Sequence, residues 1–524
     1  MPFSRPRASN RVPAAKWDCH TGRVRGTTQA YPRVGPSDGD QRLNILLLMT
    51  DQQRWDALGC SGSWVKTPAL DRLAREGVRF AQAYTNAPVC VPARAAFATG
   101  RYPHNTGVWK NEPYELAADA PTWMRAVRSA GYRTSVFGKI HLHPQRGDLR
   151  DRENLVRSWG LDDIDEIAGP RAATRCKSNL TERWKAAGVY DAYRADLRDR
   201  YATKAWVARP SPLPLEHYAD VYVGEQAAAY LRTYDDPRPW CCWVSFGGPH
   251  EPWDAPEPYA SLYDPESMPE PIRPVSDDHE RPQGLLDRKL AGGGVPFEPG
   301  DVARLRANYA GKVTLIDDQI SEILKVVEQR GEMDQTVIAF VSDHGEMNGD
   351  HKLLYKQNFL APAARVPVIM RLPPTFAAPA GVITNAMVEL MDVGATLVEI
   401  AGGDPVRGSF ARSLLPIIKD PSRTHREVVL SELRQEAMVA SATWKLAVNQ
   451  ANEVYLLYDL EGDALERRNL ASLPEHAEVE AQLKECLRRR ADEGDPAPSR
   501  ASKRQRSRSA VSRRLRSRRR DALQ

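Results

Sequence analysis

The sequence predicts an α/β fold in which helices flank a mostly parallel sheet, with a smaller α+β subdomain after about residue 424. Three observations predict it: short apolar runs of strand length recur, segments with helical spacing lie between them, and close-spaced strand-like pieces follow them. With 524 residues, of which 42% are hydrophobic, the chain can bury a substantial core.

The apolar runs predict buried strands. The first is 44–50, where an uninterrupted Ile-Leu-Leu-Leu-Met run suits a strand covered on both faces. Similar runs occupy residues 134–137, 240–246, 336–341 and 366–372.

Helices are predicted between these strands. The segment 67–76 opens with Thr-Pro and ends at Gly77, and 119–130 opens with Asp-Ala-Pro and ends at Gly131. Helical spacing of apolar residues also covers 217–233, 302–329 and 388–401.

Two stretches interrupt the alternation within the larger predicted domain, 43–423. Residues 144–215 read as a partly helical insertion that roofs a pocket, and residues 264–300, with many prolines and three consecutive glycines, read as a long irregular loop. The subdomain, 424–490, has strand-like pieces at 427–431, 437–440, 445–449 and 453–459 and a helix over 474–490.

The formal net charge of +5 is unevenly placed. Residues 1–42 carry +5 and residues 499–524 carry +10, so the body between them carries −10. We therefore expect a disordered basic extension at 1–42 and a disordered Arg/Ser-rich tail at 491–524, and no nucleic-acid-binding domain. No apolar run is long enough to span a membrane and the N-terminus has no apolar signal segment, so we expect a cytoplasmic protein.

The seven cysteines are scattered without a Cys-x-x-Cys pair. This pattern indicates neither a zinc ribbon nor a disulfide scaffold, and it favours reduced thiols.

Two acidic sites follow predicted strands. Asp51 and Gln52 end the first strand, and Asp343 and His344 directly follow another. Ligands of open α/β sheets bind at the carboxyl edge of the strands, so these side chains could meet there around one divalent cation. The alternative is that each is a hydrogen-bonded loop residue.

A third candidate is Cys90, which precedes Pro92 and Arg94 in a segment that suits a helix ending at Gly100. The cysteine would then lie at a helix N-terminus, where backbone N–H groups favour an anion. A small buried apolar role is the alternative for a lone cysteine.

These motifs resemble the type I sulfatases of the alkaline phosphatase superfamily. Cys90-x-Pro92-x-Arg94 with Thr99-Gly100-Arg101 is similar to their signature, and further similarities in the expected order extend over about residues 43–475. They are Asn44–Asp51, Thr67–Phe80, Gly131-Tyr132 through Lys139-x-His141, Pro249-His250-x-Pro252, Ser342–Glu346, and Leu457–Leu460 through Asn469-Leu470. The resemblance implies an alkaline-phosphatase-like fold.

Some positions depart from the common pattern. Ala93 replaces a frequent serine, while Gln52 and His344 resemble the choline sulfatase and phosphonate monoester hydrolase branch. The resemblance to that branch implies that the metal ion is calcium, which is our first expectation, or manganese. Lys139-x-His141 follows the sulfatase pattern instead.

The resemblance implies that Cys90 is modified to formylglycine, whose hydrate attacks the sulfur of a small organic sulfate ester. The implied metal ligands are Asp51, Gln52, position 90, Asp343 and His344. The implied catalytic residues are Cys90, Arg94, Lys139, His141, His250 and Lys356, and the implied substrate contacts are Asn111, Lys139, His250 and Lys356.

Two other functions remain open at this point: a phosphonate monoester or phosphodiester hydrolase with the same nucleophile, and a non-catalytic scaffold. The expected partners are the sulfate ester substrate and a formylglycine-generating enzyme, and a homo-oligomer is compatible with the sequence.

Overall fold

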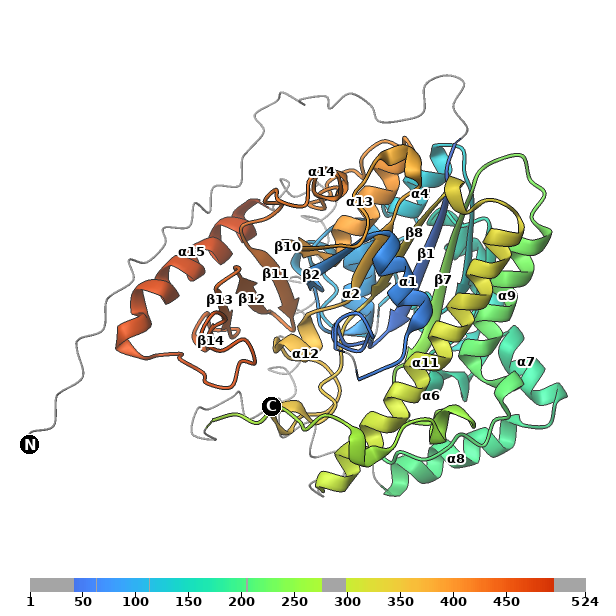
Figure 1. Cartoon of the computed structure of the whole chain (residues 1–524), viewed down its shortest axis with the longest axis horizontal. Helices are drawn as coiled ribbons and strands as arrows, with labels where there is room; N and C mark the ends of the chain where they lie inside the picture. Colours follow the sequence, from blue (N-terminus) through green and yellow to red (C-terminus); the bar gives the residue numbers. More distant parts are fainter. Residues whose placement is uncertain (1–41, 63, 113, 204–205, 276–297, 494–524) are drawn as a thin grey trace, which may run out of the picture.

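The computed structural model describes residues 42–493 except 63, 113, 204–205 and 276–297. Its centre is an eight-stranded sheet with the strand order β10-β2-β9-β8-β1-β7-β3-β5 (Figure 1). The strands are β1 (Asn44–Asp51), β2 (Val78–Tyr84), β3 (Arg133–Gly138), β5 (Asp163–Glu166), β7 (Trp240–Pro249), β8 (Thr336–Ser342), β9 (Val368–Arg371) and β10 (Val382–Glu389). Every neighbouring pair is parallel except the two that β9 makes.

The predicted mostly parallel sheet is therefore confirmed, with differences in detail. Strands β2 and β10 were not predicted, because their polar residues interrupt the apolar runs by which the other strands were found. Strand β5 lies inside the predicted insertion 144–215 but pairs with β3, so that part of the insertion belongs to the main sheet.

Helices cover both faces of the sheet because the apolar residues of β1 alternate in direction. Ile45, Leu47 and Met49 pack with α2 (Cys90–Thr99), α4 (Trp123–Ser129) and α13 (Leu390–Ile400). Leu46 and Leu48 pack with α1 (Pro68–Glu76), α9 (Ala219–Thr233) and α11 (Pro299–Gln329). A strand buried on both faces explains why its sequence is continuously apolar.

Two helices are capped differently from the prediction. Helix α4 begins at Trp123, not at Asp119, because the hydroxyl of Thr122 accepts the backbone N–H of Arg125 at 3.1 Å. Helix α1 begins at Pro68 as expected, but Thr67 does not cap it. The carboxylate of Asp317 on α11 instead accepts the backbone N–H groups of Ala69 and Leu70, each at 2.9 Å.

The predicted insertion is partly helical, as expected. It contains α5 (Glu153–Ser158), α6 (Pro170–Ala173), α7 (Asn179–Ala186), α8 (Tyr190–Thr203) and the paired short strands β4 (Gly147–Asp148) and β6 (Cys176–Lys177). Most of the predicted loop 264–300 lies outside the described residues, as do almost all of the predicted extension 1–42 and tail 491–524.

The C-terminal subdomain is an antiparallel sheet with the order β11-β12-β13-β14. Its strands are β11 (Val429–Leu433), β12 (Glu436–Ala440), β13 (Trp444–Val448) and β14 (Val454–Asp459), and α15 (Ala477–Glu493) covers one face. The other face packs against the lobe that contains the eight-stranded sheet, through residues such as Phe359 and Met387. The α+β prediction is confirmed.

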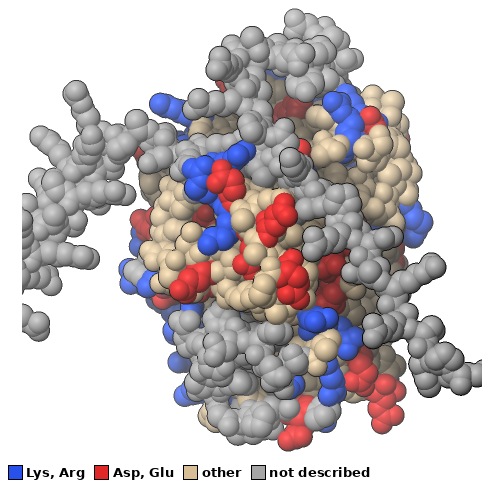
Figure 2. All heavy atoms as spheres, turned by 90° about the vertical axis from the view of Figure 1, so that its left-hand side faces the viewer, with Lys and Arg blue, Asp and Glu red and all other residues tan. Residues whose placement is uncertain are grey.

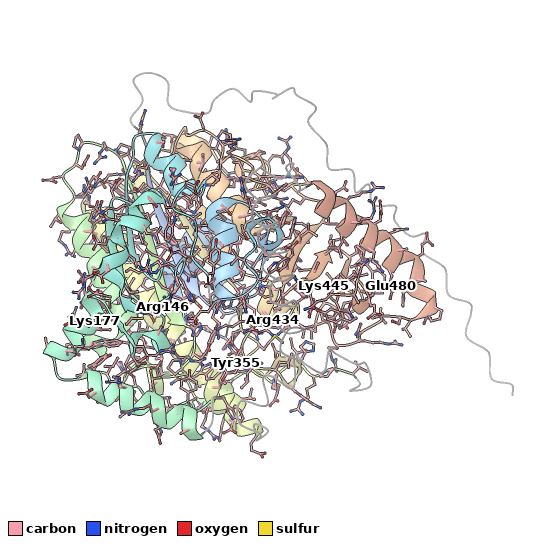
Figure 3. All side chains as sticks on the ribbon, turned by 180° about the vertical axis from the view of Figure 1, so that it is seen from behind. Arg146, Lys177, Tyr355, Arg434, Lys445 and Glu480 are labelled. Carbon is pink, nitrogen blue, oxygen red and sulfur yellow. The ribbon has the colours of Figure 1, made fainter. Side chains whose placement is uncertain are left out.

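The two lobes lie side by side (Figure 1). From behind, Lys445 and Glu480 mark the C-terminal lobe, Lys177 marks the opposite side, and Tyr355 and Arg434 lie between them (Figure 3). On the outer face of the C-terminal lobe, acidic and basic side chains are interspersed (Figure 2). Among the described residues, no helix is both long and apolar enough to cross a membrane.

The remaining short elements connect these units: α3 (Pro103–Thr106), α12 (Ala361–Ala364), α14 (Leu415–Lys419), η1 (Leu149–Arg152), η2 (Leu215–His217), η3 (Tyr259–Ser261), η4 (Pro265–Ser267), η5 (Met333–Gln335), η6 (Asp350–Lys352), η7 (Pro374–Phe376) and η8 (Pro474–His476).

Candidate active site

The carboxyl ends of four central strands supply the site. Asp51 ends β1. Lys139 directly follows β3, His250 directly follows β7, and Asp343 directly follows β8. The register pairs Thr50 with Ser342 and Asp51 with Pro249, so the residues that follow these strands come together. This is the sheet edge at which the sequence predicted a site.

Cys90 is the first residue of α2, and the thiol is free and buried. The predicted helix is confirmed, including its left-handed end at Gly100. Beside the cysteine, the side-chain oxygen of Asn111 accepts the backbone N–H of Val91 at 3.0 Å. Asn111, predicted to contact substrate, therefore holds the start of this helix.

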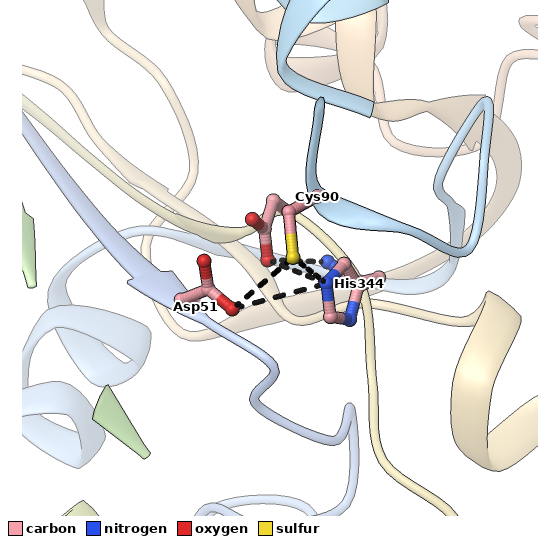
Figure 4. A group of neighbouring side chains, drawn as sticks. Asp51, Cys90 and His344 are labelled. Carbon is pink, nitrogen blue, oxygen red and sulfur yellow. Dashed lines mark hydrogen bonds and ion pairs between the residues drawn. The ribbon is translucent and has the colours of Figure 1, made fainter. Parts of the chain in front are cut away.

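Four buried side chains meet at the sheet edge (Figure 4). The ligand atoms of Asp51, Cys90, Asp343 and His344 lie within 4.8 Å of one another. The Sγ of Cys90 is 3.2 Å from Nε2 of His344 and 3.9 Å from Oδ1 of Asp51. His344 Nδ1 lies 3.0 Å from the carbonyl of Gly345, a contact that leaves Nε2 to face the group.

This donor set fits a divalent cation. Two carboxylates and one imidazole, all buried, converge, and a backbone carbonyl fixes the ring of His344 by its far nitrogen. The two carboxylate oxygens of this set suit a hard cation, and the imidazole nitrogen is a ligand that manganese also accepts.

Cations of the chain surround the same group. Arg94, fully buried, donates from Nε to Asp343 at 2.7 Å and from NH2 to Asp51 at 3.1 Å. Its NH1 donates to the carbonyl of Lys139 at 2.6 Å and to Ser245 at 3.0 Å, so the guanidinium ties the carboxylates to β3 and β7. The ammonium of Lys139 donates to Asp51 at 2.5 Å.

These charges decide two ionisation states. Burial opposes the charge of Asp51, but Lys139, His250 and Arg94 hold its pKa well below the ordinary value. Burial and Asp51 likewise oppose a thiolate at Cys90, but Lys139, Lys356 and His344 hold the pKa of the thiol well below its ordinary value. The site therefore favours an anion at position 90.

A second cluster adjoins the first. Lys356 Nζ lies 2.7 Å from Nε2 of His250 and 3.3 Å from Glu251, and it donates to the side-chain oxygen of Gln52. The Gln52 amide donates to Glu251 at 2.8 Å and also to Glu346. Gln52, predicted as a metal ligand, is thus hydrogen bonded to Lys356, and its contact with a metal stays a prediction.

His141 lies against Cys90. Burial and the charge of Lys139 lower the pKa of His141 to about 4, although a hydrogen bond with Cys90 opposes this shift. Its Nδ1 is buried and has no hydrogen-bond partner within the described chain. His141 and Gln52 both have positive φ angles, 57° and 71°, a backbone state that is uncommon outside glycine and clusters at functional sites.

Three site residues were missed by the sequence analysis: Glu251, Lys312 and Ser245. Glu251 is buried beside His250, and its place in the Pro249-His250-Glu251-Pro252 motif was the available signal. Lys312, in the middle of α11, donates from Nζ to the carbonyls of His250 and Pro252 at 2.6 and 2.8 Å. No local pattern points from α11 to this loop.

Gly138 explains how Lys139 reaches the site. Its φ is +110°, and a Cβ there would lie 1.9 Å from the carbonyl oxygen of Ser245. Only glycine allows β3 to approach β7 so closely before the chain turns into Lys139.

Known proteins share both the sequence and the fold. A family model described as sulfatase matches residues 43–403, and one described as N-sulphoglucosamine sulphohydrolase, C-terminal, matches residues 349–493. An arylsulfatase of Clostridium perfringens is 29% identical over 85% of this chain and 93% of its own length. A choline-sulfatase of Rhizobium meliloti is 30% identical over 82% of this chain and 83% of its own length.

A solved structure of similar fold is a phosphonate monoester hydrolase of Agrobacterium radiobacter. It superposes with a TM-score of 0.72 at 25% identity, covering 86% of this chain and 96% of the other. Its likeness confirms the large, mostly parallel sheet with a small antiparallel C-terminal sheet. Taken with the family match over most of the catalytic domain, these likenesses show that the chain belongs to the sulfatase family and is a hydrolase that acts on sulfuric esters.

Proposed function

We propose that Cys90 is converted to formylglycine and that this residue, with one divalent cation, hydrolyses a small organic sulfate ester. The observation that carries the proposal is the surroundings of Cys90: a helix N-terminus, two carboxylates, an imidazole and two lysines face one buried side chain. A formylglycine-generating enzyme would be the partner that matures the chain.

The cation would be held by Asp51, Asp343, His344 and position 90, with Gln52 adjoining them. We propose calcium, with manganese as the alternative, because two carboxylates favour hard cations. When both groups are present, they would supply a hydroxyl nucleophile that is ionised at neutral pH.

The charges of Lys139 and Lys356 both favour an anion at position 90. We assign them to the oxygens of the transferred sulfuryl group, where negative charge must be stabilised. Asn111 would act indirectly by holding the first turn of α2, because its side-chain oxygen accepts the backbone N–H of Val91.

His250 and Lys356 would protonate the leaving oxygen. The Nδ1 of His250 lies 2.7 Å from the carbonyl oxygen of Glu251, so Nε2 accepts from Lys356 at rest. The Lys356 ammonium could therefore deliver a proton to the leaving oxygen either directly or through Nε2 of His250.

His141 would take a proton from the hydrated aldehyde. Its pKa of about 4 leaves the ring neutral at pH 7, and one of its nitrogens is without a partner in the described structure. Release of sulfate would then regenerate the aldehyde without attack by a separate water.

The first experiment is mass spectrometry of the peptide that contains Cys90, from full-length chain produced together with a formylglycine-generating enzyme. We expect an aldehyde or its hydrate. An unmodified thiol under these conditions would exclude the proposed nucleophile.

Cys90→Ala should lower turnover of an aryl sulfate by at least about 1,000-fold without unfolding the chain, because the nucleophile is lost. Cys60→Ala is the matched control, since this half-buried thiol lies outside the buried group. Substantial activity of Cys90→Ala would remove the assignment.

A phosphonate monoester or phosphodiester hydrolase is the second candidate. The likeness to the Agrobacterium enzyme and the Gln52 and His344 positions favour it. The ratio of kcat/KM on an aryl sulfate to that on an aryl phosphonate and an aryl phosphodiester decides between the two. A sulfate that is much the poorest substrate would favour the second candidate.

A further inference from the structure

A short segment of the insertion borders the site. A Cβ added at Gly169 would lie 3.3 Å from Nζ of Lys139, and two residues further NH1 of Arg171 lies 3.6 Å from Oε1 of Glu251. Glu251 in turn contacts Lys356. The start of α6 therefore runs along the site from one assigned sulfate-binding lysine toward the other.

Arg171 is held in place but remains open to solvent. Its guanidinium lies over the ring of Tyr201 at 4.6 Å, while its side chain is 54% exposed. Within the described part of the chain, the pair with Glu251 is the only ion pair or hydrogen bond of this guanidinium. Most of its five N–H donors are therefore available to a ligand.

Arg200, in the same insertion, shows what a structural arginine looks like. It is buried, and it donates to Asp196 and to the carbonyls of Val207, Trp253, Arg209 and Pro210. Its donors are satisfied by the fold. The donors of Arg171 are not, although its guanidinium lies over the ring of Tyr201.

Glu251 does not neutralise Arg171 alone. This buried carboxylate also lies 3.3 Å from Lys356 and 3.2 Å from Nδ1 of His250, and it accepts from Gln52. It is thus shared between two cations, one on the reaction side and one at the rim. The rim keeps a positive charge that an anionic group of a ligand can approach from solvent.

We propose that Arg171 binds a second anionic group on the substrate, a carboxylate or a further sulfate, so that the preferred substrates are sulfate esters of acidic alcohols. The inference rests on the proposed function, because the position of the scissile sulfate between Lys139 and Lys356 defines the side on which the alcohol leaves. It also makes Arg171 a specificity residue rather than a part of the reaction.

The test compares two esters of similar shape, 4-carboxyphenyl sulfate and 4-carbamoylphenyl sulfate, whose para substituent is uncharged, on the matured, metal-loaded full chain at low ionic strength. We expect kcat/KM to favour the carboxylate by about tenfold, the worth of one charge-assisted hydrogen bond. Arg171→Ala should reduce this ratio to about one, mainly through KM of the carboxylate ester. Arg171→Lys should restore part of it.

Arg183→Ala is the matched control. This arginine of α7 also pairs with a glutamate, Glu225 at 2.8 Å, and lies over a tyrosine ring, Tyr222 at 5.6 Å, yet neither contact joins it to the site. It should leave the ratio unchanged. A wild-type ratio of about one, or an Arg171→Ala variant that slows both esters equally, would overturn the proposal.

A binding measurement separates this inference from the proposed function. Calorimetric titration of Cys90→Ala with the two esters should show tighter binding of the carboxylate, and the added change Arg171→Ala should abolish the difference. Failure of the matured chain to hydrolyse either ester would reject the sulfatase mechanism, whereas equal binding of the two esters would reject the role of Arg171.

Discussion

Arg94 contacts the carboxylates of both Asp51 and Asp343, so a single residue stabilises two buried charges of the site. Two buried carboxylates repel each other, and burial together with Asp51 raises the pKa of Asp343. Arg94 and Lys139 offset part of that repulsion through the contacts at 2.7, 3.1 and 2.5 Å. A divalent cation would offset the rest, which explains why the site can keep two acidic residues in its interior.

Asp343→Asn should therefore weaken metal binding and activity together, by more than the roughly 10–100-fold that loss of an outer-shell partner costs. The amide keeps the shape of the side chain but loses the charge. Metal content by elemental analysis and turnover of an aryl sulfate check this, with Asp236→Asn as a control at a peripheral ion pair with Arg238. Unchanged metal content would place the ion elsewhere.

Lys312 is a positioning residue for His250. Lys312→Met should free the loop carbonyls of His250 and Pro252 and lower kcat by about tenfold, because proton delivery needs a fixed imidazole. The loss should grow as the leaving alcohol becomes less acidic, a dependence that a general loss of stability does not produce. Lys325→Met, on the exposed part of the same helix, is the control.

Helix α1 shows at the scale of elements how a distant residue replaces a local cap. Asp317 of α11 accepts the first free N–H groups of α1 and is fully buried. Burial raises the pKa of Asp317 to about 7, although these two hydrogen bonds oppose the shift. The start of α1 is thus tied to the protonation state of Asp317 on α11.

This coupling predicts a pH dependence of stability. The folded chain holds the Asp317 proton more tightly than the unfolded chain, whose ordinary pKa is 3.8. The contribution of the protonated Asp317 to the free energy of unfolding is therefore complete below about pH 4. It is lost as the pH rises toward about 7, and the free energy of unfolding falls by at most about 1.4 kcal/mol per pH unit.

Asp317→Asn cannot titrate, so the free energy of unfolding of the wild type, measured against this variant in urea, should fall across that range. Asp235→Asn, an exposed residue, serves as the control and should follow the wild type. A difference between the wild type and Asp317→Asn that does not vary with pH would contradict the assignment.

At the scale of the whole molecule, a buried ionic network joins the two lobes. Arg426, just before β11, donates to Asp392 of α13, to the carbonyl of Phe410 at 3.1 Å, and lies 3.6 Å from Glu389. The carboxylate of Glu389 also accepts the backbone N–H of Leu430 at 2.9 Å. The first strand of the C-terminal sheet is thereby anchored to the catalytic domain.

Arg426→Met should lower the free energy of unfolding by about 3–5 kcal/mol, because it leaves the buried carboxylates of Asp392 and Glu389 without the guanidinium, while Asp392 keeps only His425 as an ion-pair partner among the described residues. Lys325→Met, which removes an exposed pair with Glu322, should cost less than about 1 kcal/mol. Urea denaturation measures both. Similar costs for the two variants would show that the network does not join the lobes energetically.

The sequence by itself determined the parts that depend on neighbours along the chain. Continuous apolar runs predicted β1, β3, β7 and β8, and the Cys90 segment with Gly100 predicted α2. Asp51, Asp343 and His344 could be placed at one sheet edge because each lies at or just beyond the end of a predicted strand, and parallel strands end at the same edge.

Only the tertiary structure decided the parts that depend on contacts between distant segments. It paired β5 of the insertion with β3 and made β9 antiparallel to its neighbours. It also made Asp317, not Thr67, the cap of α1, and it placed Lys312 in contact with the His250 loop. Propensity and spacing are local, whereas hydrogen bonds and charges are satisfied wherever the folded chain brings a partner. Arg171 belongs to this second group, because its role follows from Tyr201 and Glu251, which are remote from it in sequence.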